Sequence, residues 1–557
     1  MRWISCLQEI LSMSINPEQL SNRVASFFAA QDSEWKPIVT RLLDALKEGH
    51  ICIALNEDEL KIVKMCKDVY QTLNDNQIEC TQADKPFVLD KGHLYVQRYW
   101  LHEVEVANRL RVLSQVTLQL PLSLDTYFND EYQQLSAQMA LTKQLAVITG
   151  GPGTGKTTTV VKILALLLMQ SPELTIKVAA PTGKAAARLS ESLRHGKHNV
   201  EFVRACFSGQ EQALDAVPEE ATTLHSLLGA IHGSPEFRHH KGNPLHADVV
   251  VVDEASMVDI GMFNRLLRAL PSQCKLILMG DADQLASVEA GAVLSSIAQG
   301  MPEHRVHLQN TYRFGGAIKA LAVAVNEQHL EAFDTVLSNA YPAINMVSGS
   351  VIDFAKAQYS AYAKCVEHFS KVGDITTVFE TFAQFQVLTA TRSDKEQFDA
   401  LGQRLGLAQT EQHWYHGRPV MITQNQADIG LFNGDVGIVL ATLAEHNQQE
   451  LRVYFPSSDG YRSFLPAQLP AHETAFAMTV HKSQGSEFGH VCLVMPDNNK
   501  LSSNPSQLNQ LICKELLYTG ITRAKQQVSL VGELEVLHFA ISTNTQRNSL
   551  LTQRLLA

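Results

Sequence analysis

The sequence predicts an α/β protein whose core is a parallel β-sheet. In segment 145–170 a short apolar run leads through a glycine-rich turn into apolar positions at helical spacing. In segment 248–256, DVVVVDEAS, four consecutive valines fit a strand that is buried on both faces of a parallel sheet. Further apolar runs at 175–180 and 275–279 also end in polar residues. Because the carboxyl ends of parallel strands meet at one edge of a sheet, we expect these polar residues to form one site.

Length and charge limit the kinds of protein that this chain can be. Its 557 residues are too many for one hydrophobic core, and 45% hydrophobic with 18% charged residues is a globular composition. The net charge is −11, so any contact with a polyanion must follow a local track of basic residues. No apolar run approaches the length of a membrane span, and the first residues do not resemble a signal peptide. With nine widely spaced cysteines, this predicts a cytoplasmic protein with reduced thiols and no membrane contact.

The turn at 150–157 fits the pattern G-x-x-x-x-G-K-[ST]. Backbone amides in such a turn, together with the positive end of the following helix, converge on an anion. Lys156 would reach the β and γ phosphates, and the hydroxyl of Thr157 would hold Mg²⁺. A chance glycine-rich turn is the alternative, but the strand before and the helix after supply the context that the motif needs. The predicted nucleotide contacts are Gly150, Gly151, Pro152, Gly153, Thr154, Gly155, Lys156, Thr157 and Thr158.

Gln133 lies on the helix expected before the first strand. Its amide can both donate to and accept from an adenine edge, which guanine would not match. Taken alone the signal is weak, because most glutamines are simply solvated. Beside a phosphate loop, it favours ATP over GTP.

Two carboxylates follow the valine strand. Asp253 is expected to bind Mg²⁺ directly or through water, and Glu254 is expected to polarise the water that attacks the γ-phosphate. The strand predicted at 275–279 runs into GDADQL, where Gln284 would contact the γ-phosphate. Strands that each end in such a motif describe a RecA-like α/β sheet with its ligand at the carboxyl edge.

Later motifs supply groups from outside this first sheet. The segments 308–314, LQNTYRF, and 517–525, LYTGITRAK, carry Arg313 and Arg523, which we expect to act as arginine fingers from a second domain. Surface ion pairing is the alternative for either arginine. Segment 477–488, AMTVHKSQGSEF, ends in residues that suit the ribose or the phosphates of a nucleotide. The nucleotide contacts predicted from these later segments are Tyr312, Gln484, Gly485 and Glu487.

Hydroxyl, ammonium and imidazole groups recur at expected strand ends and helix starts, where they can bind phosphodiesters. They occur in 181–189 and 222–229, although helix capping explains the threonines there equally well. They occur again in 477–488, and a loop that touches both DNA and nucleotide would couple hydrolysis to movement. The predicted DNA contacts are Thr182, Lys184, Thr223, His225, Thr479, His481, Lys482 and Ser483.

The motif positions divide the chain into four parts. The first part lacks a catalytic signature and is interpreted as a mostly helical domain, followed by a linker at 122–134. Its helices are expected at 18–30, 35–47 and 57–73, with extended pieces at 51–55 and 94–99. Short β-type runs split by turns predict an inserted barrel. The expected domains are 1–115, 116–300 with the ATP site, 301–394 together with 470–557, and the inserted barrel at 395–469.

The ordered motifs GGPGTGKTTT, APTGKAAARL, VVDEASMVD, GDADQL, YRF, AMTVHKSQGSEF and YTGITRAK resemble superfamily-one DNA helicases. The resemblance is closest to the RecD family, the α subunits of bacterial RecBCD (exonuclease V) enzymes, and covers roughly residues 90–540. It implies two RecA-like P-loop motor domains, an SH3-like inserted barrel, and ATP and Mg²⁺ as cofactors. It also implies a 5′→3′ translocase on single-stranded and double-stranded DNA, in a bacterial heterotrimer with RecB-like and RecC-like subunits. That complex would act in double-strand break repair and homologous recombination.

Two alternatives remain at this point: a stand-alone RecD-like helicase without partners, and a P-loop ATPase that moves no DNA. In the RecD-like interpretation, residues 1–115 would dock on the RecC-like subunit. Four aromatic residues, Trp35, Tyr95, Tyr99 and Trp100, are candidates for an exposed docking surface, although burial is the commoner explanation for any one of them. A fragment that begins near residue 116 is then expected to keep its ATPase activity and to lose its partners.

Overall fold

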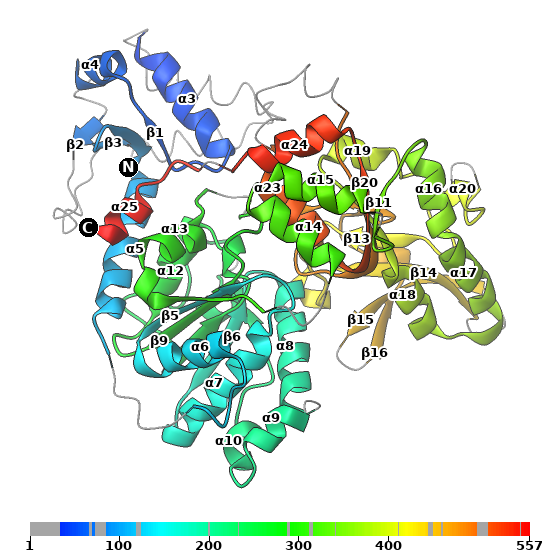
Figure 1. Ribbon diagram of the computed structural model, residues 1–557, viewed down its shortest axis with the longest axis horizontal. Coiled ribbons are helices and arrows are strands. Elements are labelled where there is room, and N and C mark those ends of the chain that lie inside the picture. Colours follow the sequence, from blue (N-terminus) through cyan, green and yellow to red (C-terminus); the bar gives the residue numbers. More distant parts are fainter. Residues whose placement is uncertain are drawn as a thin grey trace.

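The computed structural model shows two lobes, with the N-terminal elements above the first lobe (Figure 1). The first lobe is built on a six-stranded sheet and the second on a five-stranded parallel sheet, next to which lies a separate antiparallel sheet. The structure describes residues 34–65, 70–72, 85–117, 124–198, 201–231, 233–286, 290–310, 316–339, 341–409, 412–443, 449–457, 460–497, 511–545 and 547–557. Among the helices of these ranges, none has the length and apolar character needed to cross a bilayer.

The sheet of the first lobe is parallel and has the strand order β10-β5-β9-β8-β6-β7. Its strands are β5 (Leu145–Gly150), β6 (Ile176–Ala180), β7 (Thr222–Thr223), β8 (Val249–Val252), β9 (Lys275–Gly280) and β10 (Arg305–Leu308). The strands predicted from the apolar runs are confirmed. The valines of β8 are all buried, because this strand lies inside a sheet that is covered on both faces.

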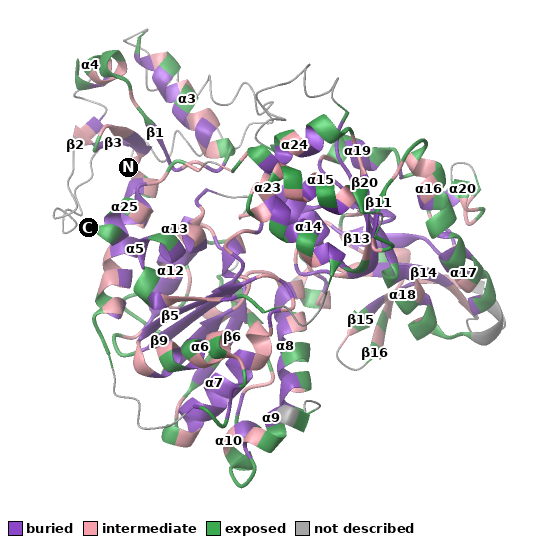
Figure 2. Cartoon of the chain, in the orientation of Figure 1, coloured by how far each residue is buried: buried purple, intermediate pink, exposed green. Residues whose placement is uncertain are grey.

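Alternate residues of the strands enter two different hydrophobic clusters. Ala146 and Ile148 pack with the helices on one face, whereas Leu145 and Val147 pack with those on the other. The first face is covered by α6 (Glu131–Thr142), α7 (Lys156–Gln170) and α8 (Gly183–His198). The opposite face is covered by α5 (Gln97–Ser114), α12 (Ile260–Ala269) and α13 (Val293–Gly300). In Figure 2 the strands β5 and β9 are accordingly buried, and exposed residues lie on the outer sides of the helices and in loops; on β6 only Lys177 is exposed.

The N-terminal part contains a four-stranded sheet of order β1-β4-β3-β2. Its elements are α3 (Trp35–Lys47), β1 (Cys52–Ala54), α4 (Glu57–Met65), β2 (Tyr70–Thr72), β3 (Phe87–Asp90) and β4 (His93–Val96). The helix predicted at 35–47 is confirmed. The helix predicted at 57–73 is wrong at its end, because Tyr70–Thr72 is a strand that pairs with β3. The helix predicted at 18–30 lies outside the described residues.

The aromatic residues proposed for an exposed surface are mostly core residues. Trp35, Tyr95 and Trp100 are at most 2% exposed, and Trp35 packs edge-on against Phe87. The indole of Trp100 donates a hydrogen bond to Asp90 over 2.9 Å. The expectation of exposure is wrong for these three residues, since their rings fill the space between the small sheet and the helices that cover it.

Helix α5 joins the N-terminal part to the first lobe. Its side chains Val104, Ala107 and Leu110 belong to the same cluster as strands β5, β8 and β9. The expected linker is also packed, since Leu124 and Phe128 are buried in the cluster on the opposite face. A fragment starting at residue 116 would leave one face of the sheet without α5. We therefore no longer expect such a fragment to keep its ATPase activity.

The second lobe has a parallel sheet of order β11-β20-β19-β12-β18. Its strands are β11 (Ile344–Met346), β12 (Phe385–Thr389), β18 (Ala477–Thr479), β19 (Phe488–Val494) and β20 (Ala524–Val531). Its helices include α14 (Ala317–Asn326), α15 (Leu330–Ser338), α16 (Val351–Gln358), α17 (Ser360–Val372), α18 (Ile375–Ala383), α23 (Lys514–Ile521) and α24 (Leu534–Ser542). The expected boundary at residue 300 is wrong, because β10 pairs with β5 and so extends the first sheet.

An antiparallel sheet is inserted between β12 and β18, with the order β16-β15-β14-β13-β17. Its strands are β13 (Pro419–Ile422), β14 (Val436–Leu443), β15 (Gln449–Ser457), β16 (Gly460–Phe464) and β17 (His472–Thr474). The expected end of the insertion at 469 is wrong, because β17 lies beyond it and pairs with β13. The SH3-like character of this insertion remains a prediction.

Shorter elements complete the described chain. The short α-helices are α9 (Glu201–Cys206), α10 (Glu211–Asp215), α11 (Leu224–Leu228), α19 (Arg392–Glu396), α20 (Leu401–Arg404) and α25 (Leu551–Leu556). The 3-10 turns are η1 (Ala255–Met257), η2 (Pro302–His304), η3 (Ala427–Ile429), η5 (Pro466–Gln468) and η6 (His481–Ser483).

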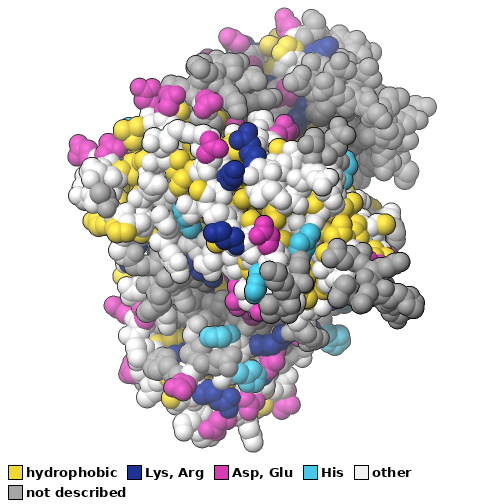
Figure 3. Space-filling view, turned by 90° about the vertical axis from the view of Figure 1, so that its right-hand side faces the viewer, with side chains coloured by type: hydrophobic (Ala, Val, Ile, Leu, Met, Phe, Trp, Pro, Cys, Tyr) yellow, Lys and Arg dark blue, Asp and Glu magenta, His cyan; other side chains and the backbone are white. Residues whose placement is uncertain are grey.

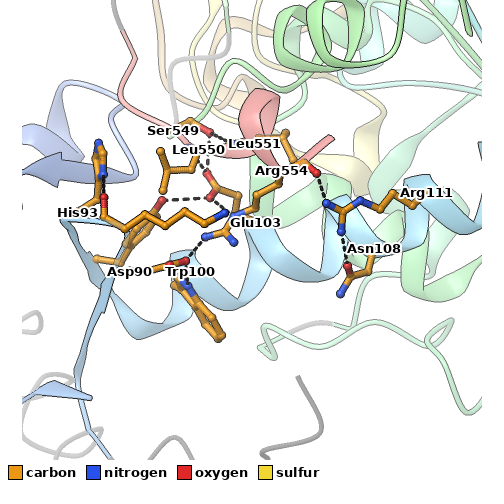
Figure 4. Close-up of polar contacts among 12 residues, drawn as sticks. Asp90, His93, Trp100, Glu103, Asn108, Arg111, Ser549, Leu550, Leu551 and Arg554 are labelled. Atoms are coloured by element: carbon orange, nitrogen blue, oxygen red, sulfur yellow. Dashed lines mark hydrogen bonds and ion pairs between the residues drawn. The ribbon is translucent and has the colours of Figure 1, made fainter. Parts of the chain in front are cut away.

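The last residues leave the second lobe and return to the first. From α24 the chain crosses to α25, which packs against α5 and α13 (Figure 1). Arg554 is buried between Asp90 and Glu103, with 2.7 Å from its Nε to a Glu103 oxygen (Figure 4). Glu103 also accepts hydrogen bonds from Ser549 Oγ and from the Leu550 N–H. The assignment of all of 470–557 to the second lobe is therefore wrong, because this tail is held by a buried ionic network.

We expect Arg554→Ala to destabilise the chain by roughly 3–5 kcal/mol, because two buried carboxylates would lose their cation. The measurement is urea denaturation of the full chain. Lys61→Ala removes an exposed ion pair with Asp58 and serves as the control, with an expected change below about 1 kcal/mol. An unchanged urea midpoint for Arg554→Ala would show that the network contributes nothing to stability.

Candidate nucleotide site and the family of the chain

The glycine-rich turn between β5 and α7 has the backbone geometry of an anion cradle. Gly153 and Gly155 have φ values of 77° and 80°, which side-chain-bearing residues rarely adopt. A Cβ atom on Gly150 would lie 2.8 Å from Thr154 Oγ1 and 3.0 Å from the carbonyl oxygen of Leu308. The turn leads directly into the N-terminus of the fifteen-residue helix α7. Amide groups and the helix dipole therefore point to one place, as the sequence predicted.

Lys156 lies at the start of α7 with its ammonium group over the turn. Its Nζ donates to the carbonyl oxygens of Gly150, at 2.7 Å, and Gly151, at 3.0 Å. Thr157 and Thr158, the next two residues, are only partly buried. A cation, a hydroxyl and helix-terminal amides that remain accessible fit the phosphates and the magnesium ion of a nucleotide.

Asp253 and Glu254 follow β8 at the carboxyl edge of the sheet. The N–H of Glu254 donates to Asp253 Oδ1 over 2.8 Å. Burial raises the pKa of Asp253 to about 6, the charge of Glu254 adds to the rise, and Lys156 opposes it. Glu254 has a φ of 50°, a left-handed conformation that costs a non-glycine residue about 1–2 kcal/mol. Strain of this kind is typical of a side chain whose direction matters for function.

Asp281 is a site residue that the sequence reasoning missed. It follows β9 at the same edge, is 1% exposed, and accepts a hydrogen bond from the Gln284 amide at 3.0 Å. Burial raises the pKa of its carboxyl group to about 6, whereas the positive charge of Lys156 lowers it. The rule that selected Asp253, a carboxylate at the end of a buried strand, would also have selected Asp281.

The second lobe closes over this edge through three hydrogen bonds. Tyr518 OH donates to Asp281 Oδ2 over 3.1 Å, and Thr519 Oγ1 accepts from the Leu285 N–H at 3.0 Å. Gln484 Nε2 donates to the carbonyl oxygen of Leu285 at 2.9 Å. Gln484 was predicted from the sequence as a nucleotide contact, whereas Tyr518 and Thr519 were not. Both lie in the motif YTGITRAK, from which the sequence reasoning selected only Arg523, and their partners in the first lobe are more than two hundred residues away in the chain.

Arg523 lies just beyond α23 and is 3% exposed. Its guanidinium donates to the carbonyl oxygens of Thr519, at 3.2 Å, and Ser486, at 3.4 Å. Its charge acts on two cations of α8, Lys184 and Arg188. Burial lowers the pKa of Lys184 to about 7, and the charge of Arg188 lowers it further. Basic groups from both lobes therefore gather at the interface, where an added anion would favour their charged forms.

The remaining nucleotide candidates lie on several different elements. Gln133 lies in the first turn of α6, whose N-cap Asp130 also accepts a hydrogen bond from Asn310 at 2.6 Å. Gly485 has a φ of 68°, and Glu487 lies 3.8 Å from Lys525. The predicted contacts Tyr312 and Arg313 lie outside the described residues.

Two of the three threonines predicted to bind DNA serve as helix caps in this structure. Thr182 Oγ1 accepts from the Ala185 N–H, and Thr223 Oγ1 accepts from the Ser226 N–H. This is the alternative that the sequence left open for them. His225, next to Thr223, is exposed on the surface.

The lysines predicted to bind DNA are held by the inserted sheet and its loops. Lys184 Nζ donates to the carbonyl oxygen of Gly434 at 3.2 Å, and Lys482 forms a 2.8 Å ion pair with Glu473. Lys395 also lies 3.8 Å from Glu473. On the face seen in Figure 3, basic side chains form small groups separated by acidic ones.

The other candidates of segment 477–488 are less accessible. Ser483 is fully buried and donates to the carbonyl oxygen of Val480 at 2.7 Å, so its hydroxyl shapes the turn and does not face solvent. Thr479 is 8% exposed. His481 is partly buried, and this burial lowers the pKa of its imidazole.

Two family models match the chain at the positions of this site. A model described as an AAA domain matches residues 133–290, which include the P-loop and Asp253. A model described as a UvrD-like helicase C-terminal domain matches residues 474–531, which include Gln484 and Tyr518. The chain is therefore a P-loop helicase with a nucleotide-binding part and a second motor part.

Relatives that match most of the chain define the family. The RecBCD enzyme subunit RecD of Mycolicibacterium smegmatis is 36% identical over 489 residues, which cover 83% of this chain and 82% of the relative. The same subunit of Mycobacterium tuberculosis is 32% identical over 576 residues, which cover 98% of this chain and 95% of the relative. The chain belongs to the RecD family of RecBCD enzyme subunits, and it is an ATP-dependent DNA helicase. The resemblance read from its motifs is confirmed.

A relative whose name does not refer to the RecBCD enzyme matches less completely. The ATP-dependent RecD2 DNA helicase of Deinococcus radiodurans is 28% identical over 429 residues, which cover 74% of this chain and 50% of the relative. The match to the RecBCD subunits is closer in both identity and coverage, so the stand-alone alternative is not favoured.

We expect Lys156→Gln to reduce ATP hydrolysis on the order of 10³-fold, because a cation that clamps the phosphates would be lost. The melting temperature should stay near that of the wild type, since Lys156 is only partly buried at the domain edge. The measurement is steady-state ATPase activity with single-stranded DNA present. Lys177→Gln, an exposed position on β6, is the matched control and should keep full turnover. More than about a tenth of wild-type turnover in Lys156→Gln would contradict the phosphate role.

Proposed function

We propose that the chain is the 5′→3′ single-stranded DNA translocase of a RecBCD-type helicase–nuclease, which acts in double-strand break repair and homologous recombination. Its partners would be a RecB-like and a RecC-like subunit, and its substrates single-stranded and double-stranded DNA. The observation that carries the proposal is the meeting of the P-loop edge with Tyr518 and Gln484 of the second lobe. Hydrolysis at such a joint moves one lobe against the other, which is what a translocase needs. The RecBCD names of the relatives support the choice of partners.

In this proposal each residue of the first lobe has one task at the nucleotide. Lys156 and the amides of the turn bind the phosphates, and Thr157 and Asp253 hold Mg²⁺. The site fits these ligands because a hydroxyl and a carboxylate at the strand edge are the oxygen donors that Mg²⁺ prefers. Glu254 accepts a proton from the attacking water. Bound Mg²⁺ would supply charge neutralisation at the phosphates.

The second lobe would supply the groups that respond to hydrolysis. Arg523 and Arg313 would stabilise the charge that develops on the transferred phosphoryl group. Gln484, Gly485 and Glu487 of the second lobe would line the nucleotide. Gln284 of the first lobe would contact the γ-phosphate from the opposite side. Arg523 is buried in the second lobe, where its guanidinium donates to two backbone carbonyls of that lobe, and its charge acts on Lys184 and Arg188 of the first lobe.

DNA would run along the groups at the ends of β6, β7 and β18. Lys184, His225, Thr479, His481 and Lys482 are the proposed contacts, with Thr182 and Thr223 placed beside them as helix caps. The ion pair of Lys482 with Glu473 is partly exposed, so phosphates can displace Glu473 at a cost of about 1 kcal/mol or less.

We expect Glu254→Gln to bind ATP and DNA normally but to hydrolyse ATP at least about 100-fold more slowly, because an amide cannot accept the proton of the water. Nucleotide affinity is measured by equilibrium binding, and turnover by phosphate release. Glu173→Gln, at an exposed position of the same lobe, is the matched control. If ATP affinity collapses while turnover survives, Glu254 is a binding residue and the base lies elsewhere.

We expect the full chain to co-purify with RecB-like and RecC-like subunits when the three are co-expressed, and to unwind duplexes that carry a 5′ overhang. Size-exclusion chromatography tests the first expectation, and strand displacement on 5′-tailed and 3′-tailed duplexes tests the second. A chain that elutes alone and remains active would support the stand-alone helicase. ATPase activity that does not respond to single-stranded DNA would support a switch that moves no DNA.

A further inference from the structure

We propose that Tyr518 is a positioning residue that links closure of the two lobes to the nucleotide turn and to Gln284. The inference rests on the proposed function, because it requires hydrolysis at the P-loop. It concerns a residue of the second lobe that lies in the motif YTGITRAK and to which the proposed function gives no task. Three contacts carry it: one to Asp281, one to the glycine-rich turn, and one made by the neighbouring Thr519.

The first contact completes the hydrogen bonding of a buried carboxylate. Asp281 Oδ2 accepts from Tyr518 OH at 3.1 Å and from Gln284 Nε2 at 3.0 Å. The other oxygen, Oδ1, accepts from the Asp283 N–H at 3.1 Å. Tyr518 and Gln284 therefore share one acceptor atom. Movement of the tyrosine hydroxyl shifts the carboxylate that holds the side chain of Gln284.

The second contact is with the nucleotide turn. A Cβ atom on Gly151 would lie 2.8 Å from the hydroxyl oxygen of Tyr518, so the hydroxyl bears directly on the backbone of the turn. The carbonyl of Gly151 accepts a hydrogen bond from Lys156. A cavity of about 110 Å³ adjoins this point and is lined by Gly151, Thr154, Asp283 and Tyr518, among others. The tyrosine thus lies between the turn and the Asp281–Gln284 pair.

The third contact is made by Thr519 at Leu285, where Gln484 adds a second hydrogen bond. Thr519 accepts from the Leu285 N–H, and Gln484 donates to the Leu285 carbonyl. The segment 281–285 is thus fastened to the second lobe at both ends, by Tyr518 at one end and by Thr519 and Gln484 at the other. Any displacement of α23 relative to the first lobe must therefore move Gln284, and the reverse also holds.

A purely structural role for Tyr518 makes a different prediction. Its ring belongs to the hydrophobic core of the second lobe, so its loss would lower stability in any case. Tyr359 offers a matched comparison, because its buried hydroxyl donates to the Phe476 carbonyl at 2.8 Å within the second lobe. Both Tyr→Phe variants lose one buried hydrogen bond, but only Tyr518 faces the nucleotide turn.

The test is Tyr518→Phe in the full chain, with Tyr359→Phe as the control, in an ATPase assay saturated with single-stranded DNA. We expect Tyr518→Phe to lower kcat about tenfold with KM for ATP within about twofold, because a bond that aligns Gln284 is lost while the phosphate contacts remain. Tyr359→Phe should change the melting temperature and leave kcat and KM near the wild-type values. In a Gln284→Ala background, Tyr518→Phe should cause little further loss, since both act through one carboxylate.

Several outcomes would overturn the inference. A kcat of Tyr518→Phe within twofold of Tyr359→Phe would show a core role only. A raised KM with unchanged kcat would make Tyr518 a nucleotide contact, and full additivity with Gln284→Ala would show that the two residues act independently.

Glu254→Gln is measured in the same assay to distinguish failure of this inference from failure of the proposed function. If it retains turnover, the base lies elsewhere, and if Lys156→Gln also retains turnover, the hydrolysis site itself is misassigned and the role of Tyr518 falls with it. If it is inactive while Tyr518→Phe is normal, only the present inference fails.

Discussion

Coverage of both faces of the first sheet is the constraint on which the rest of the structure depends. The strands carry apolar side chains on alternate sides, so each face must be buried. Helices α6, α7 and α8 cover one face. Helices α12 and α13 cover only part of the other face. The rest of that face is covered by α5 from the N-terminal part and by α25 from the end of the chain. Residues far from the P-loop in sequence are therefore part of the hydrophobic core of the lobe that contains the nucleotide site.

With both faces covered, only the edges of the sheet remain for chemistry. The carboxyl edge collects a cation, Lys156, and two carboxylates, the partly buried Asp253 and the buried Asp281, whose pKa values desolvation raises to about 6. Each responds to the charge of Lys156, so the three form one electrostatic unit. The second lobe meets this unit through hydrogen bonds from one helix and one turn. A joint of few, directional bonds can open and close without disturbing either hydrophobic core.

The inserted sheet and its loops contact two of the lysines that were predicted to bind DNA. Its loop carbonyl at Gly434 binds Lys184, and its Glu473 binds Lys482. These contacts occupy two lysines that are proposed to bind the DNA backbone. They are partly exposed and individually weak, so a polyanion with several phosphates can replace them. In the proposed function, the insertion would therefore move when DNA binds.

The sequence by itself determined strands β5, β6, β8 and β9, the glycine-rich turn, Lys156 and the two carboxylates that follow β8, because these depend on apolar runs and backbone conformation within a few residues. It also identified the family, because the family's motifs are short stretches that can be recognised in order along the chain. Only the tertiary structure decided that Asp281 and Tyr518 meet, that β10 extends the first sheet, and that Arg554 is buried with Glu103. These contacts join segments far apart in the chain. They are set by which apolar faces need covering, and no local pattern records which distant helix will cover them.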